Sequence, residues 1–185
     1  MRWLFAIAVL GACGSSELAV RSYVARGWEG KLDRLLGPSQ CVPMPGEPLL
    51  VPAGDHWRAS AIGHAHVPCT NGALELDIGE PAWLAIAVPA VIGAKPTDVT
   101  LAAYDAAGRE LELGDGAVTW TVTGQARERT TSCEHHDDMD FLCGAIEVMA
   151  SRPASTYVAG TAAGSATITA RFGGLVATRT VTVTL

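Results

Sequence analysis

The C-terminal part of the chain alternates apolar and polar residues with a period of two. Val181, Val183 and Leu185 are separated by threonines, and the same alternation runs through 166–172 and, much earlier, through 74–78. Successive side chains of a strand point to opposite faces of a sheet, so each of these segments predicts a strand with one buried face.

Turn clusters rich in Gly, Asp and Pro divide the chain after residue 81 into short segments of this kind. No segment there has a comparable helical periodicity. Short strands at near-regular spacing favour a β-sandwich or barrel, so the sequence predicts an all-β fold. The expected strands are Trp83–Val88, Val99–Tyr104, Val118–Thr123, Ala145–Met149, Thr156–Gly160, Ala166–Phe172 and Val176–Leu185.

Four segments follow one another in a distinctive order: Val99–Gly108, Val118–Val122, Ala162–Ala170 and Val181–Thr184. In this order they resemble the bacterial immunoglobulin-like domain of the group 2 type, over about residues 81–185. The resemblance implies an immunoglobulin-like β-sandwich with Trp120 packed between its two sheets.

The segment 124–144 departs from that family as an insertion loop containing Cys133 and Cys143. Between them, residues 134–140 hold six side chains that could bind a metal, as Glu134-His135-His136-Asp137-Asp138-Met139-Asp140. The spacing matches neither a His-Glu-x-x-His zinc motif nor a calcium loop, and bridged cysteines would be lost as zinc ligands. We interpret the loop as a solvated acidic tip closed by a disulfide. A metal-binding envelope protein that uses residues 134–140 is the alternative function.

Residues 38–80 are predicted to form a small extension, Pro-rich at first and then a β-hairpin. The hairpin pairs Ala61–Cys69 with 74–78 across a turn at Asn71-Gly72, and Trp57 is expected to pack beneath it. The extension looks too small to own a core and is expected to lean on the following domain. His64 and His66 would share one face of the hairpin, but no third metal ligand is evident, so we interpret them as an exposed pair.

A leader over residues 13–37 carries apolar residues at Val24, Trp28, Leu32 and Leu35. Spacings of four, four and three are typical of one helix face, so a marginal amphipathic helix is expected. Glycines inside the segment weaken this expectation.

The first twelve residues have the features of a secretory signal peptide: Arg2, then the ten-residue apolar run Trp3–Ala12. The run ends in Leu10-Gly11-Ala12-Cys13, which resembles the lipobox of bacterial lipoproteins. The resemblance implies cleavage before Cys13 and a lipid anchor on its thiol. Gly14, in place of Asp, implies sorting to the outer membrane in two-membrane bacteria. An ordinary signal peptide with an incidental cysteine is the alternative.

The chain has five cysteines, and an odd number in an exported protein needs an explanation. Assigning Cys13 to the lipid leaves Cys41, Cys69, Cys133 and Cys143, which allow three connectivities. Export places them in an oxidising compartment, where disulfides persist. Local pairing, Cys41 with Cys69 and Cys133 with Cys143, is our hypothesis.

The net charge and the absence of known motifs exclude several classes of function. The net charge is −6, and without a Lys/Arg cluster the chain is a poor candidate for binding nucleic acid. The common nucleophile-elbow, phosphate-loop and dinucleotide motifs are absent, and the carboxylates at Glu110, Glu112 and Asp115 lie beside a turn, where charge is expected for solubility. The sequence therefore predicts a non-enzymatic envelope protein without a cofactor. The lipid on Cys13 would attach it to the membrane. The immunoglobulin-like domain would bind an envelope protein or glycan, or would serve as a spacer.

Overall fold

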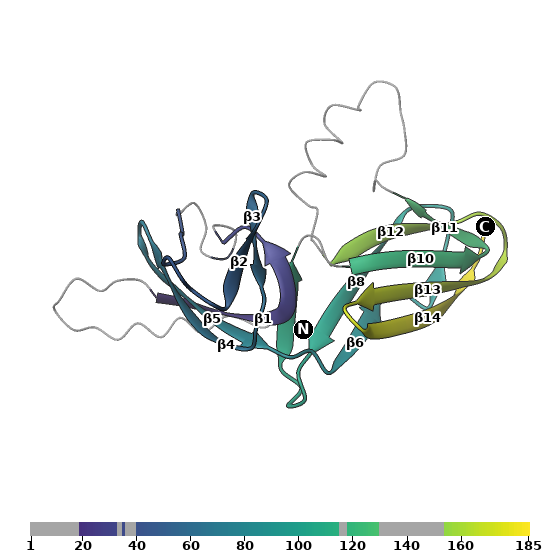
Figure 1. The fold of residues 1–185 in the computed structure, drawn as a ribbon. Coiled ribbons are helices and arrows are strands. Elements are labelled where there is room, and N and C mark those ends of the chain that lie inside the picture. The colour runs from purple at the N-terminus through teal and green to yellow at the C-terminus, as the bar shows by residue number, and fades with distance from the viewer. Residues whose placement is uncertain (1–18, 33–34, 36–39, 115–117, 130–153) are drawn as a thin grey trace, which may run out of the picture.

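The computed structural model describes residues 19–32, 35, 40–114, 118–129 and 154–185 (Figure 1). Within these ranges the chain folds into β-strands, as the alternation predicted. The strands are β1 (Ala19–Gly30), β2 (Leu50–Ala53), β3 (His56–Ala59), β4 (Gly63–Cys69), β5 (Gly72–Gly79), β6 (Trp83–Ala87), β7 (Val91–Ile92), β8 (Thr97–Tyr104), β9 (Glu110–Gly114), β10 (Val118–Gly124), β11 (Ala126–Arg129), β12 (Ser155–Gly160), β13 (Gly164–Phe172) and β14 (Leu175–Val183).

The C-terminal strands form two packed sheets. One sheet runs β6–β8–β12–β11, and the other runs β10–β13–β14–β7. Leaving out β7 and β9, the chain order of these seven strands gives the immunoglobulin arrangement, in which strands A, B, E and D face strands C, F and G. The predicted immunoglobulin-like β-sandwich is therefore confirmed.

The sandwich core follows from the alternation in the last two long strands. Ile168 on β13 and Val181 and Val183 on β14 are at most 2 % exposed, and they pack against Val99 and Val158 from the opposite sheet. The threonines between them lie on the outer face, where a hydroxyl stays hydrated.

Trp120 on β10 is half-buried and packs against two apolar clusters of the sandwich. Its central position agrees with the prediction, although the ring is not fully enclosed.

The N-terminal strands enclose a core to which β1 contributes Val24 and Trp28 alongside residues from the segment 38–80. The predicted hairpin is present as β4 and β5, with Thr70 and Asn71 in the turn and Gly72 opening β5 at a φ of 139°. The β2–β3 hairpin contributes Leu50 and Ala59 to this core, and Trp57 packs against it as predicted. The buried members are Val24, Trp28, Leu32, Leu50, Ala59, Ala65, Val67, Leu74, Leu76 and Ile78.

The helix predicted in the leader is wrong for residues 19–30, which form the strand β1. This strand runs parallel to β5 over Ala19–Ala25 and then meets β9 and β3. Gly27, at a φ of 92°, lies where the register against β9 shifts between Val24 and Glu29, and Trp28 then joins Val24 in the N-terminal core. A strand buried on both faces has no simple alternation, and this is why the apolar spacing resembled a helix.

Strand β9 connects the two parts of the molecule. It leaves β8 by a hairpin and pairs in parallel with β1, so that one sheet continues from the sandwich into the N-terminal strands (Figure 1). Ala25 of β1 consequently packs in a cluster with Leu111 of β9 and Phe172 of β13. Strand β1, the first strand of the described residues, therefore contributes to the sandwich core.

The segment 124–144, predicted as an insertion loop, begins with a short strand. Residues Ala126–Arg129 form β11 and pair with β12, and Ala126 is buried against the sandwich core. The remainder of that loop, and the strand predicted at Ala145–Met149, lie outside the described residues.

Candidate functional site

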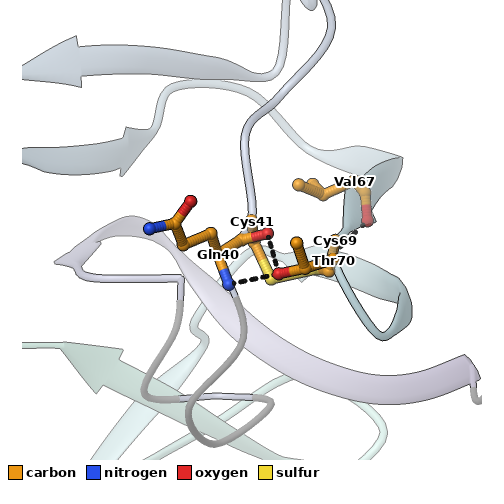
Figure 2. Close-up of a disulfide and its surroundings, with 5 residues drawn as sticks. All are labelled: Gln40, Cys41, Val67, Cys69 and Thr70. Carbon is orange, nitrogen blue, oxygen red and sulfur yellow. Dashed lines mark hydrogen bonds between the residues drawn. A yellow bond between two sulfur atoms is a disulfide. The ribbon is translucent and has the colours of Figure 1, made fainter.

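Cys41 and Cys69 form a disulfide that ties the Pro-rich segment to the β4–β5 hairpin (Figure 2). Backbone pairing surrounds the bond. The amide of Gln40 donates to Oγ1 of Thr70 at 2.8 Å, and the amide of Thr70 donates to the carbonyl of Gln40 at 3.0 Å. The expected pairing of Cys41 with Cys69 is therefore present, and it closes one end of the N-terminal core.

The other predicted site residues lie outside the described part of the chain. They are Cys13, Cys133, Cys143 and the residues 134–140 considered for metal binding. Among the residues that are described, no group of three His, Cys, Asp or Glu side chains is placed to share a metal ion. Within the same residues there is also no helix with the length and apolar character needed to cross a membrane.

The two histidines of the hairpin belong to a ladder of charged side chains across β4, β5 and β1. His64 contacts Asp77 through Nδ1 at 3.0 Å and Glu75 through Nε2 at 2.8 Å. His66 contacts the same Glu75 through Nδ1 at 2.6 Å, and Arg21 of β1 pairs with Asp77. Both ring nitrogens of His64 thus face carboxylates, an arrangement that favours the doubly protonated imidazolium.

The ladder shifts the titration of its members in opposite directions. The hydrogen bond with Asp77 raises the pKa of His64 above its ordinary value. The hydrogen bond from Arg21 lowers the pKa of Asp77, and the one from His66 lowers the pKa of Glu75. The side chain of His64 is 53 % exposed, so solvent screening keeps the contribution to stability small.

Measured between neutral and mildly acidic pH, the stability of the folded chain should include a small contribution from His64. Because its pKa is raised in the folded state, this contribution is complete below the unfolded value of about 6.5 and disappears as the pH rises through the folded value. The carboxylates Asp77 and Glu75, with lowered pKa values, contribute above about pH 4 and lose that contribution in more acidic solution.

An NMR titration of the His64 ring checks this prediction. The Asp77→Asn variant should bring the pKa of His64 down toward its ordinary value, since the largest cause of the shift is removed. Asp98→Asn, at an exposed position on β8, serves as the control and should leave the titration of His64 unchanged. An unchanged pKa in Asp77→Asn would show that the ladder does not hold His64 in its charged form.

A shallow, open hollow of about 280 Å³ lies beside the disulfide. Lys31 and Asp55 pair in its lining at 3.2 Å, and Lys31 lowers the pKa of the Asp55 carboxyl. The hollow mixes one aromatic side chain with an amide, an ion pair and aliphatic groups, so its chemistry selects no ligand class. Its lining is Lys31, Leu32, Gln40, Cys41, Val42, Asp55 and Trp57.

No protein-family model matches the chain, and no curated protein matches it significantly. Solved structures do resemble its fold. A glycosyl hydrolase family 2 member from Bacteroides cellulosilyticus is 19 % identical, with a TM-score of 0.41, over 70 % of this chain and 18 % of its own. The Escherichia coli adhesin FdeC is 17 % identical (TM-score 0.38, 78 % of this chain and 48 % of its own). The integrin-binding protein invasin is 12 % identical (TM-score 0.40, 87 % and 34 %).

The chain spans less than a fifth of the length of that glycosyl hydrolase. Similarity at this level assigns no activity and no partner to the chain. The strand order alone therefore defines its class, an all-β protein that contains an immunoglobulin-like β-sandwich.

Proposed function

We propose that this chain is a lipid-anchored protein of the cell envelope, without catalytic activity, whose immunoglobulin-like sandwich binds an envelope protein or glycan or serves as a spacer. The observation that carries the proposal is the sequence Leu10-Gly11-Ala12-Cys13 at the end of a short apolar run. Two or more acyl chains hold a protein stably at a membrane, whereas one holds it only marginally. In a two-membrane bacterium, Gly14 in place of Asp favours sorting of the anchored protein to the outer membrane.

The disulfide supports this location independently of the N-terminal motif. A disulfide such as that between Cys41 and Cys69 is typical of oxidising compartments, among them the periplasm and the cell surface. The net charge also supports attachment through a lipid. Loss of Arg2 with the signal peptide moves the net charge from −6 to −7, so attachment depends on the lipid and not on basic residues.

Replacing Cys13 with serine is expected to abolish membrane attachment. In a bacterial host, the unaltered chain should appear in the membrane fraction at the mass of residues 13–185 plus its acyl groups. The Cys13→Ser variant should lack the acyl mass and leave the membrane fraction. Intact-mass measurement on fractionated cells tests both.

Ser16→Ala is the matched control, because it alters a neighbouring side chain outside the motif and should remain lipidated. A soluble, unacylated chain without the Cys13 substitution would reject the lipid anchor. It would also return Cys13 to the set of cysteines available for disulfides.

A further inference from the structure

Four segments lie side by side at the end of the molecule where the chain arrives from Cys13. Ala19 opens β1 opposite Ala73 of β5, and Ala73 faces Pro68 of β4. The carbonyl of Pro68 accepts the amide of Val42 at 3.2 Å. We call this row, from Ala19 to Val42, the tether edge. Neighbouring strands lie about 4.8 Å apart, so Val42 lies about 15 Å from the point where the tether joins β1.

Val42 and Met44 form an apolar tip on the tether edge. Their exposed fractions are 64 % and 54 %, among the largest for apolar side chains in the described part of the molecule. The neighbouring residues Gln40 and Thr70 are uncharged, and their backbones are paired with each other. The charged groups of the adjacent hollow, Lys31 and Asp55, neutralise one another. Val42 and Met44 are themselves uncharged, and the charged residue nearest to them along the chain is Glu47, whose amide donates to the carbonyl of Met44 at 3.1 Å.

The length of the tether limits how far this edge can lie from a membrane that holds the acyl chains. Six residue steps separate Cys13 from Ala19. Even a fully extended chain of that length spans only about 20 Å. The distal end of the sandwich has no such limit, because the C-terminus lies at the opposite side of the molecule from the start of β1 (Figure 1).

We propose that Val42 and Met44 insert into the interfacial layer of the bilayer that anchors Cys13. The N-terminal core then rests on the membrane, and the sandwich points away from it. This inference rests on the proposed lipid anchor. Burial of the apolar tip supplies the driving force, and since neither Val42 nor Met44 is basic, contact does not depend on anionic lipid.

Tryptophan fluorescence in the acylated, full-length protein tests the insertion. Met44→Trp places a reporter on the tip, and Val91→Trp places one on β7. Val91 is a matched control because it is also an exposed apolar residue, 54 % accessible, and it pairs with Thr182 near the C-terminus. Each protein is reconstituted into vesicles of phosphatidylethanolamine with or without phosphatidylglycerol, containing lipids brominated on the acyl chains.

Insertion should shift the emission that Met44→Trp adds to the unaltered protein to the blue, and brominated lipid should quench most of that emission. Val42→Trp should give the same result. Val91→Trp should keep its emission, and the presence of phosphatidylglycerol should make no difference. Absence of quenching at residues 42 and 44, or equal quenching at residue 91, would overturn the proposed orientation.

Flotation and intact mass of the same samples separate this result from a failure of the anchor. Protein that floats with vesicles and carries acyl mass, but shows no quenching at Met44→Trp, refutes insertion of the tip and leaves the anchor intact. Protein that lacks acyl mass and does not float refutes both.

Discussion

Replacing Trp28 with alanine is expected to lower the free energy of unfolding by about 3–5 kcal/mol, the usual range for truncating a buried tryptophan. The side chain is 3 % exposed in the N-terminal core. The indole fills space that two glycines leave open. A Cβ at Gly30 would lie 2.7 Å from one ring atom, and a Cβ at Gly114 would lie 2.8 Å from another. Because backbone from β1 and β9 borders the ring, the strands cannot close the resulting cavity without moving their pairing.

Denaturant unfolding followed by far-ultraviolet circular dichroism measures this loss. Trp83→Ala is the matched control, since Trp83 is 48 % exposed and contributes mainly by stacking on Tyr104, with ring centroids 4.1 Å apart. A stacked aromatic pair of this kind contributes about 0.5–1.5 kcal/mol. Equal losses in the two variants would show that the N-terminal core contributes little to the stability of the fold.

Removing the disulfide with Cys41→Ala and Cys69→Ala together should lower the free energy of unfolding by about 3–4 kcal/mol. The bond closes a loop with a sequence separation of 28, and the chain-entropy relation gives a value in this range for the added freedom of the unfolded chain. The hydrogen bonds between Gln40 and Thr70 keep the two segments together in the folded state. The loss therefore arises mainly in the unfolded ensemble.

Thr70→Ala provides the comparison for the disulfide. It removes a side chain that accepts from the Gln40 amide but leaves the covalent bond, so it should lower stability by only about 1 kcal/mol. Hydrogen exchange should show that the cysteine variant loses protection in β4 and β5 before β13 and β14. If the cysteine variant were no less stable than Thr70→Ala, the bond would have no role beyond that of its neighbours.

The sandwich was predictable because its strands are buried on one face only. In β13 and at the end of β14 the threonines lie on the more exposed face, whereas Ala166, Ile168, Ala170, Val181 and Val183 are buried, so a period of two can be recognised in the sequence. The start of β14 departs from this pattern, since Val176 is 50 % exposed. The hairpin β4–β5 was predictable for the same reason. Its turn fell one residue earlier than expected, since Gly72 opens β5 after Thr70 and Asn71.

Strand β1 could not be predicted in this way. Val24 faces the N-terminal core and the next residue, Ala25, faces the sandwich cluster, so both sides of the strand are apolar. The alternation disappears, and a spacing that resembles one helix face remains. Parallel partners distant in sequence fix the strand conformation, and tertiary pairing of this kind overrides local pattern.

Five short strands were not predicted, although one of them carries a clear signal; they are β2, β3, β7, β9 and β11. Glu110-Leu111-Glu112-Leu113 alternates, and in β9 both leucines are buried at 3 % exposure. The same residues also fit the charge expected beside a turn, so the alternation alone does not identify the strand. Strand β11 has only four residues, Ala-Arg-Glu-Arg, with a single buried side chain, so its period cannot be recognised.

The disulfide between Cys41 and Cys69 could be predicted from cysteine counting and local pairing. The charged ladder could be predicted only in part. Because the hairpin register places His66 opposite Glu75 and His64 opposite Asp77, the sequence contained those pairs once the turn was known. The contribution of Arg21 was not accessible, because it depends on the parallel pairing of β1 with β5.

The parallel pairing of β1 also determines how the molecule responds to mechanical force. A pull on the N-terminal end acts along the axis of this strand, whose hydrogen bonds to β5 extend from Ala19 to Ala25 and are followed by contacts with β9. These bonds run across the strands, so tension loads them in shear, and many must break together instead of one after another. A protein held at this end and pulled at the other would resist rupture at its first strand.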